Sequence, residues 1–521
     1  MRNISKKGPH RWVRCVIPTG WGLALLLGCG SPKTVPGDTL RSRPDVWVNA
    51  VTETTDGDIT RDSTVTWESD NLSPEDGYTP SKDTLGGGDA LDGDTVEPDE
   101  WTASEPTLYP SERLLSPMSP NVIHNLREIV TSTDGLQPNV FMKVGASSTV
   151  SNANLFCFAG DDVELDTYAD LEPTIDFFLG GDAAGTTPFD RASLAAKVGM
   201  SAGWVLEGFP SPLESEIQAI QPRFAFVHYG TNDKGLGATY ASALWKFGDR
   251  MMELSGVLIE RGIVPILLTI AARGDKPDAN RWVATYNAVI RAIAQGLQIP
   301  LLDLHFALKT LDGFGLSGDG IHLNTYKKNG SNRPCVFTSE ALGYGMNMRN
   351  VSSLIALDAL HWTVVLQEDM FDESVPLAGE GSLQKPFAVV SLPFSDRRST
   401  LQGGESNLDT YTGCDAPQDE SGPEFVYRFT TSETRSIRAL VLDQGEVDVD
   451  IHLLDSSASE SGCLLRDHQL LEATLAPGTY HFVVDTYVQN GQNMGGDYHF
   501  VLLDCDKDDP SCSSVLLEDA P

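Results

Sequence analysis

The hydrophobic pattern of this chain changes its period after roughly Gly379. Before that point, short apolar runs alternate with stretches such as 240–261, whose apolar residues recur every three or four positions. Strand-length runs between amphipathic helices predict a parallel sheet covered on both faces, a three-layer α/β/α sandwich over 116–375. Later, apolar and polar residues alternate singly, as in 447–454. This pattern predicts a smaller all-β sandwich domain over 376–521.

Four apolar runs are the candidate strands of the parallel sheet. They cover residues 140–144, 224–229, 263–270 and 299–304. A helical segment around 350–366 is expected to close the domain. Sheets of this kind place their functional sites at the carboxyl ends of the strands. The residues that follow the four runs are therefore the first candidates for a site.

Residues 1–28 have the layout of an export signal. Basic residues without any acidic one precede a short apolar run over 21–27, far shorter than the roughly 20 residues that a membrane-spanning helix needs. The run ends in Leu26-Leu27-Gly28-Cys29, which resembles a bacterial lipobox. We expect Cys29 to carry lipid and to anchor the protein at the bacterial cell envelope, facing the periplasm or the exterior, with the outer membrane favoured. Pro18 and Gly20 weaken the signal pattern, so a plain secretory signal stays open.

Residues 29–115 are rich in Asp, Glu, Thr, Ser, Gly and Pro and lack hydrophobic periodicity. This composition predicts a disordered acidic linker between the anchor and the folded part. The whole chain has a formal net charge of −36. Nucleic-acid binding needs clustered Lys and Arg, so the charge argues against nucleic acid as a partner.

Export would place the cysteines in an oxidising compartment, where disulfides are the default. Apart from Cys15 in the signal and Cys29, two cysteines lie in the α/β region and four in the β region. No CxxC pair or His cluster accompanies them, so a zinc site is not expected. Six cysteines allow 15 pairings. Guided by domain membership, we expect Cys157–Cys335, Cys414–Cys463 and Cys505–Cys512.

Three polar motifs follow the candidate strands in order. Ser147 comes directly after the first strand, where a nucleophilic hydroxyl can be exposed at a strand-to-helix turn. Asn232 follows the second strand, and its amide can donate to a developing oxyanion. Asp319 and His322 lie in a Gly-rich loop after the fourth strand, at a spacing that lets the carboxylate bind one imidazole nitrogen while the other faces a serine. Each motif alone has an ordinary explanation as a helix cap, a turn or a loop ion pair. Together they predict a Ser-His-Asp site.

In this order the motifs resemble those of the SGNH/GDSL hydrolases, a family of esterases and lipases. The matching pieces are Gly145-Ala146-Ser147, Gly230-Thr231-Asn232-Asp233 and Asp319-Gly320-Ile321-His322. The second family block resembles 198–203, which puts the oxyanion glycine of the family on Ala202 or Gly203. Ala146 departs from the family, which has an acidic residue there. The nucleophile is still present despite this departure. The motif could, however, be aligned one residue later, which would make Ser148 the nucleophile in place of Ser147.

The resemblance implies a three-layer fold and acyl transfer in two steps. Ser147 would attack, His322 would act as its base oriented by Asp319, and Asn232 would help to hold the oxyanion. No metal or organic cofactor is expected. The expected substrate is an ester of a small molecule, a lipid or an acylated polysaccharide, with acetyl or short acyl groups included. Two alternatives remain: an inactive surface lipoprotein that acts as a binding module, and an acyltransferase with the same triad.

The β region carries two weaker signals. The turn over 475–480 resembles a recurring feature of bacterial pre-peptidase C-terminal domains, which implies a β-sandwich. Asp448 and Asp450 alternate on one predicted strand. There they would either bind calcium or lie on the solvent face of the strand.

Overall fold

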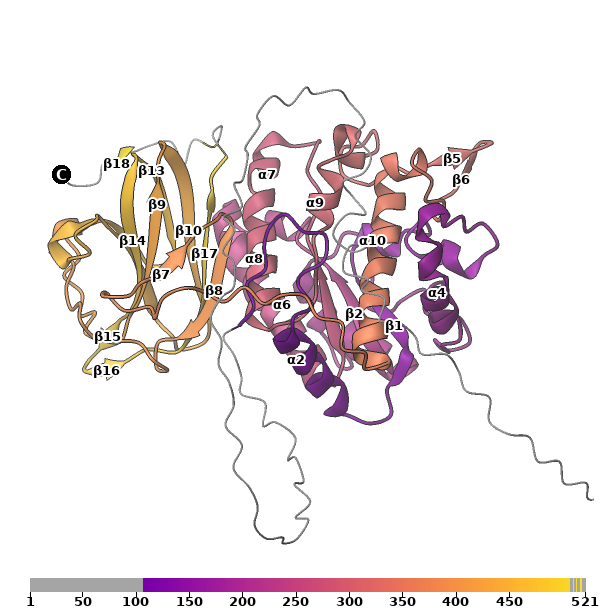
Figure 1. Cartoon of the computed structure of the whole chain (residues 1–521), viewed down its shortest axis with the longest axis horizontal. Helices are drawn as coiled ribbons and strands as arrows, with labels where there is room; N and C mark the ends of the chain where they lie inside the picture. Colours follow the sequence, from indigo (N-terminus) through magenta and orange to yellow (C-terminus); the bar gives the residue numbers. More distant parts are fainter. Residues whose placement is uncertain (1–105, 507–508, 510–511, 513–515, 518–521) are drawn as a thin grey trace, which may run out of the picture. The chain divides into compact units, whose positions relative to one another are not determined.

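The computed structural model describes residues 106–506, 509, 512 and 516–517 (Figure 1). The predicted signal, Cys29 and most of the predicted linker lie outside these residues. Within them, no helix is both long enough and apolar enough to cross a membrane.

A parallel sheet forms the centre of the α/β domain. Its strands are β1 (Gln137–Gly145), β2 (Pro222–His228), β3 (Val264–Leu268) and β4 (Leu301–Leu302). They lie in the order β1-β2-β3-β4, and each neighbouring pair is parallel. Each strand overlaps one of the four predicted apolar runs, which confirms those predictions, although β1 and β2 begin two or three residues earlier than predicted. The register pairs Gly145 with His228, so the carboxyl ends of β1 and β2 lie side by side.

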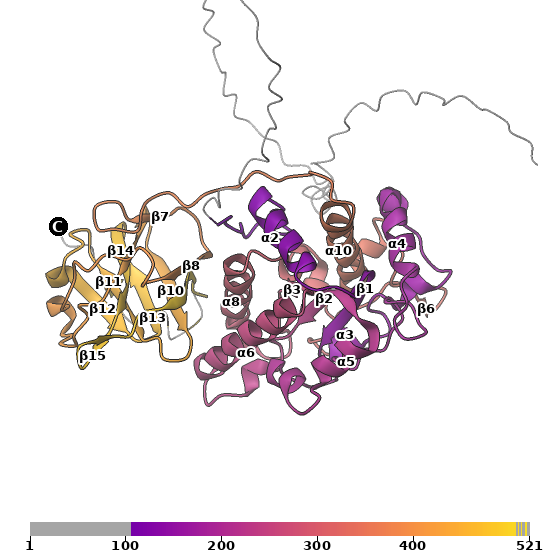
Figure 2. The same cartoon turned by 90° about the horizontal axis from the view of Figure 1, so that it is seen from below.

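Helices cover both faces of this sheet, as the alternating pattern predicted. They are α2 (Pro120–Thr131), α3 (Ser147–Val150), α4 (Glu172–Leu179), α5 (Pro212–Ile220), α6 (Tyr240–Glu260), α7 (Pro277–Arg281), α8 (Val283–Gly296), α9 (Leu304–Leu308) and α10 (Gly345–Leu360). Figure 2 shows α2 and α10 on one side of the sheet and α5 and α6 on the other. α6 begins at a capping box formed by Thr239 and Ser242. α10 is buried along its whole length, so its polar side chains need partners inside the fold. A small hairpin of β5 (Lys327–Lys328) and β6 (Ser331–Asn332) precedes α10.

Residues 106–115 pack on the α/β domain, although we expected them to belong to the linker. Tyr109, Leu114 and Leu115 are each at most 3% exposed. The Tyr109 hydroxyl donates to the carbonyl oxygen of Ile299 at 3.0 Å. Burial of these apolar side chains favours the packed segment by roughly 25 cal/mol per Å² removed from water. The folded part thus extends further toward the N-terminus than the predicted boundary at 116.

The second domain is the predicted β-sandwich. Its strands are β7 (Phe387–Val389), β8 (Phe394–Ser399), β9 (Phe425–Thr431), β10 (Arg435–Asp443), β11 (Val449–Leu454), β12 (Cys463–Asp467), β13 (Leu470–Leu475), β14 (Gly478–Thr486), β15 (Val488–Gln489), β16 (Gln492–Asn493), β17 (Asp497–Asp504) and β18 (Leu516–Leu517). One sheet has the order β18-β13-β10-β17-β8 and the other β12-β11-β14-β9-β7. Side chains such as Ile437, Val449 and Phe482 fill the core of this domain.

All three predicted disulfides are formed, and their pairing is confirmed. Cys157–Cys335 joins the segment that follows Ser147 to the segment that follows His322. The other two disulfides lie within the β-sandwich.

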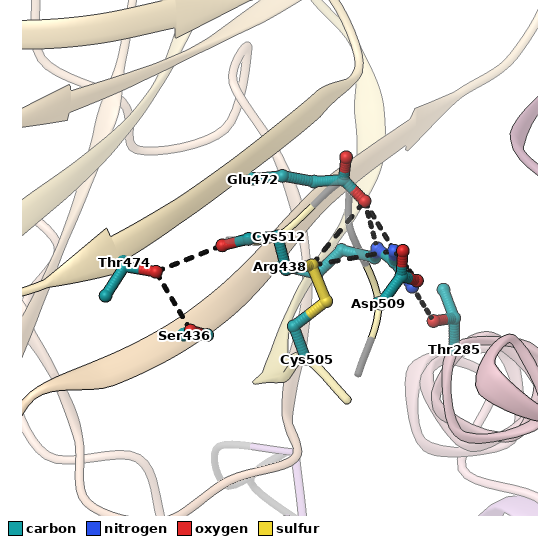
Figure 3. The surroundings of a disulfide bond; sticks show 8 residues. All are labelled: Thr285, Ser436, Arg438, Glu472, Thr474, Cys505, Asp509 and Cys512. Atoms are coloured by element: carbon teal, nitrogen blue, oxygen red, sulfur yellow. Dashed lines mark hydrogen bonds and ion pairs between the residues drawn. A yellow bond between two sulfur atoms is a disulfide. The ribbon is translucent and has the colours of Figure 1, made fainter. Parts of the chain in front are cut away.

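A buried arginine links the two domains (Figure 3). Arg438 of β10 is 1% exposed, and its Nη1 donates to Thr285 Oγ1 of α8 at 2.8 Å. Its other nitrogens donate to Glu472 at 2.7 Å and to Asp509 at 2.9 Å. The guanidinium also lies 3.9 Å from the centre of the Trp282 ring. Carboxylates of the sandwich thus compensate the charge of Arg438, and its hydrogen bond to Thr285 connects the sandwich to the α/β domain.

The same strand contributes apolar side chains to the core of the α/β domain. Leu440 and Leu442 belong to the apolar cluster built around the parallel sheet. Gly248 of α6 permits this approach, because a Cβ there would lie 2.6 Å from Leu442 Cδ2. The sandwich therefore packs against the α/β domain through a continuous core.

Candidate active site

Ser147 lies directly beyond β1 as the first residue of α3. Gly145 allows the tight approach of this turn, because a Cβ there would lie 2.3 Å from Thr149 Oγ1 and 2.8 Å from the carbonyl oxygen of His228. The carbonyl oxygen of Ala146 accepts from the Thr149 N–H at 3.0 Å. Ala146 itself packs against the apolar core. The chain thus reverses at the strand end and leaves Ser147 at the carboxyl edge of the sheet.

Ser147, His322 and Asp319 form one hydrogen-bonded chain. The Ser147 Oγ lies 2.8 Å from His322 Nε2, and His322 Nδ1 lies 2.7 Å from Asp319 Oδ2. An ionised carboxylate can only accept hydrogen bonds, so Nδ1 carries the proton and Nε2 accepts from the serine hydroxyl. In this geometry an imidazole can take the serine proton while the carboxylate stabilises the cation that results.

The loop around Asp319 favours the ionised form of this carboxylate. Its Oδ1 accepts from Ser317 Oγ at 2.8 Å, from the Ile321 N–H at 2.9 Å and from the His322 N–H at 3.0 Å. The hydrogen bond to the His322 side chain, followed by these backbone bonds, lowers the pKa of Asp319 below its ordinary value. Ser317 was not among the predicted residues.

A small hollow lies beside Ser147 and Asn232. It has a volume of about 20 Å³, and Ala146, Met200 and Ile321 are among its other lining residues. The Asn232 Nδ2 donates to the carbonyl oxygen of Met200 at 2.9 Å, which fixes the direction of the amide. The predicted nucleophile and the predicted amide donor therefore share one hollow. Met200 is a site residue that the sequence did not identify.

The backbone N–H of Ala202 is bonded away from the hollow, contrary to expectation. It donates to Asp233 Oδ1 at 2.8 Å, while Oδ2 accepts from the Gly230 N–H at 2.9 Å. A Cβ on Gly203 would face Arg250, 3.7 Å from its Cγ. Neither Ala202 nor Gly203 is among the residues that line the hollow. The buried carboxylate of Asp233 accepts the hydrogen bond of the N–H that we had assigned to the oxyanion. It thereby joins the segment around Ala202 to the segment around Gly230.

α10 supplies two buried side chains to the segment around Ser147. Arg349 is 2% exposed, and its Nη1 donates to the carbonyl oxygen of Ser148 at 3.0 Å. The Asn350 Nδ2 donates to Ala153 O at 2.8 Å, and its Oδ1 accepts from the Leu155 N–H at 3.1 Å. Burial lowers the pKa of Arg349 to about 10, so the guanidinium stays charged at neutral pH. These contacts could not be inferred from the sequence, in which Arg349 and Asn350 are simply polar residues of a helical stretch.

The groups of side chains that could hold a metal ion lie in the β-sandwich, as far as the described residues show, and none includes Ser147, His322 or Asp319. The chemistry available at the hollow is therefore that of a hydroxyl, an imidazole, a carboxylate and an amide.

Comparison with known proteins identifies the class of this domain. The model of the GDSL-like Lipase/Acylhydrolase family matches residues 179–326. The match begins after Ser147 and includes Asn232, Asp319 and His322. The chain thus carries a GDSL-like hydrolase domain, and it is a carboxylic ester hydrolase. No curated protein matches it.

Solved structures similar to this chain include esterases and a β-sandwich. A GDSL-like lipase from Bacteroides thetaiotaomicron is 14% identical, with 46% of this chain and 98% of that chain covered and a TM-score of 0.27. An acetylxylan esterase from Geobacillus stearothermophilus is 13% identical, with 43% and 96% covered and a TM-score of 0.29. The pre-peptidase C-terminal domain of a collagenase from Bacillus anthracis is 15% identical, with 22% and 95% covered and a TM-score of 0.16.

Proposed function

We propose that this chain hydrolyses acetyl and other short-chain esters, with Ser147 as the nucleophile. The observation that carries the proposal is the chain of 2.8 Å and 2.7 Å contacts from Ser147 through His322 to Asp319. Ser147, at one end of this chain, lines the small hollow. At about 20 Å³ the hollow has room for a water-sized group. We propose acetyl and short-chain esters as the substrates because the hollow beside Ser147 is small.

In the first half-reaction His322 Nε2 takes the proton of Ser147 as Oγ attacks the ester carbonyl carbon. The carbonyl electron pair moves onto oxygen, where the Ser147 N–H and the Asn232 Nδ2 are the proposed donors. One such donor contributes about 3–4 kcal/mol to the transition state. The imidazolium, stabilised by Asp319, then gives its proton to the alcohol oxygen as the C–O bond breaks.

In the second half-reaction His322 takes a proton from water, and the oxygen of that water attacks the acyl-enzyme carbonyl. The tetrahedral intermediate collapses, the bond to Ser147 Oγ breaks, and the imidazolium returns its proton to Oγ. The products are the alcohol and the carboxylic acid, so ester and water balance the reaction.

The proposed place of action is the bacterial envelope, with the protein anchored through lipid on Cys29. The three disulfides support export, because such bonds persist in oxidising compartments. A Cys29→Ser variant, expressed in a Gram-negative host with a lipoprotein-processing pathway, is expected to move from the membrane fraction to the soluble fraction. An unchanged distribution would contradict the anchor while leaving the proposed chemistry untouched.

Labelling with a fluorophosphonate tests the proposed nucleophile. Such a reagent phosphonylates only a serine activated by a base, so peptide mapping is expected to find the adduct on Ser147. Ser147→Ala should abolish labelling, while Ser148→Ala should keep it. Absence of any adduct on the folded protein would favour the binding-module alternative, whose sequence support is Ala146.

A further inference from the structure

The β-sandwich holds a second cluster of ionisable side chains, which the ester chemistry does not use. Asp450 and His452 lie on β11, and Glu420 comes from the segment that precedes β9. Glu420 and His452 are each 0% exposed and Asp450 is 4% exposed. One carboxylate oxygen of each acid and one ring nitrogen of His452 all lie within 4.8 Å of one another. Asp450 is thus buried, and is not the solvent-facing acid that one reading of the sequence allowed.

Two of these side chains are poorly partnered. Among the described residues, neither ring nitrogen of His452 makes a hydrogen bond, and no N–H donates to either carboxylate oxygen of Glu420, whose neighbour within reach is the carboxyl group of Asp450. Arg466 Nη2 is 3.8 Å from Glu420 Oε1, which is too far for a hydrogen bond. A buried polar atom without a partner costs about 1–3 kcal/mol, and native structures rarely leave several together. The cluster therefore fits a group that the protein atoms do not supply.

The charge around the cluster is negative. Asp450 is bonded to Arg466 and to His468 Nδ1, the latter at 2.9 Å. Asp448 adds a carboxylate at the rim, 3.3 Å from the same nitrogen of His468. Three acids thus face one arginine and one histidine.

His452 has the form that binds metals. Both ring nitrogens are buried without a hydrogen-bond partner, so one of them can offer its lone pair to an ion. Its ring is stacked on Tyr411, with centroids 3.5 Å apart and planes 12° apart. The sulfurs of Cys414 and Cys463, joined in a disulfide, lie within 4.8 Å of a ring nitrogen. These contacts hold the ring in place before any ion binds.

We propose that Glu420, Asp450 and His452 bind one divalent transition-metal ion of the Zn²⁺ or Mn²⁺ class. Two carboxylate oxygens and one imidazole nitrogen form a donor set suited to such ions, whereas Ca²⁺ and Mg²⁺ prefer oxygen ligands alone. Arg466 and His468 donate to Asp450 from outside, as the partners of ligating carboxylates do at metal sites. This proposal departs from the expectation of no zinc site, which rested on the cysteine spacing and the lack of a His cluster in the sequence. The ion stabilises the β-sandwich and is independent of ester hydrolysis.

Metal analysis of the whole purified protein tests this proposal. Protein prepared without chelators is expected to contain about one zinc or manganese ion per chain by plasma mass spectrometry. After chelation and dialysis, adding Zn²⁺ or Mn²⁺ should raise the melting temperature by at least about 3 °C, and Mg²⁺ or Ca²⁺ at the same concentration should not. Ester hydrolysis measured below the melting range should be equal with and without the ion.

Variants locate the ion. Glu420→Gln and His452→Gln should lose both the bound ion and the metal-dependent shift in melting temperature. Glu433→Gln, an exposed acid of the same domain, should keep both. The proposal is overturned if the unaltered protein binds no ion and none of the four cations shifts its melting, if only Ca²⁺ does so, or if His452→Gln binds zinc as tightly as the unaltered protein. The measurements on the unaltered protein decide the matter even if a variant fails to fold.

Discussion

Arg349 donates from Nη1 to the backbone oxygen of Ser148 at 3.0 Å, so a buried guanidinium of α10 holds the turn that carries Ser147. The Ala146 carbonyl is satisfied within the turn by Thr149. Ala146 offers no side-chain oxygen with which to brace that turn. The hydrogen bond from Arg349 of α10 thus holds a turn in which Ala146 replaces the acidic residue of the family.

Replacing Arg349 tests this positioning role. Arg349→Met is expected to lower kcat about tenfold with a smaller change in KM, because a shifted Ser147 loses its alignment with His322. Arg349→Lys keeps a donor and should recover part of the loss. Ser148→Ala leaves the backbone oxygen in place and serves as the control. Equal kcat values for Arg349→Met and the unaltered protein, with ester hydrolysis measured well below the melting temperature, would rule out the role.

Asp319→Asn should reduce kcat by about 10³–10⁴-fold, because an amide cannot stabilise the imidazolium and can favour the wrong tautomer of His322. The lowered pKa of Asp319 means that the native carboxylate stays ionised throughout the mildly acidic range. Asp312→Asn, an exposed acid that precedes the same loop, is the control and should be neutral. Steady-state kinetics on a p-nitrophenyl ester checks both. A loss below tenfold in Asp319→Asn would contradict its assignment.

Arg438→Met should destabilise the whole described fold by about 3–5 kcal/mol, because it leaves the buried carboxylate of Asp509 and the partly buried carboxylate of Glu472 without their shared cation. We expect the two domains to melt in one transition at a lower temperature. Arg435→Met on the same strand breaks a half-exposed pair with Asp504 and should cost under about 1 kcal/mol. Calorimetry that resolved two separate transitions in the unaltered protein would contradict the shared core.

The stability of the β-sandwich should fall as the pH rises toward neutrality. Burial raises the pKa of Glu424 from 4.5 to about 7. Between these values the folded state binds more protons than the unfolded state, so the stability present below pH 4.5 is lost as the pH rises through 7. The loss for this one group is about 3 kcal/mol at most.

Glu424→Gln should flatten that part of the pH profile, as measured by urea unfolding of chelated protein at pH 5 and pH 8. Glu433→Gln, an exposed acid of the same domain, should leave the profile unchanged. A profile for Glu424→Gln that is as steep as that of the unaltered protein would show that Glu424 titrates normally.

The parts of this fold that depend on local pattern were predictable. The strands around Val140 and Phe224 are short, unbroken apolar runs buried on both faces, and their length and their place between amphipathic helices identify them. Domain membership was a useful guide to the disulfide pairing, because each disulfide joins two cysteines of one domain. Ser147, Asp319 and His322 were predictable because each follows a strand whose carboxyl end must meet the others at one edge of the sheet.

The contacts that depend on distant segments were not predictable. Arg349 meets Ser148 because α10 packs beneath the turn, and no spacing in the sequence reports this. Ala202 was assigned to the oxyanion because local spacing does not reveal that Asp233 accepts its N–H. The linker boundary was placed too late in the sequence. Tyr109 and Leu114 lie in apolar stretches of a polar segment that are too short to show a hydrophobic period, although both side chains are buried.

Hydrolysis of a p-nitrophenyl ester series by the purified protein, with Ser147→Ala and Ser148→Ala beside it, tests the central claim most directly. The account predicts highest kcat/KM for acetate, a steep fall beyond butyrate, and loss of activity in Ser147→Ala alone. Activity that survives in Ser147→Ala, or that is greatest for long acyl chains, would contradict it.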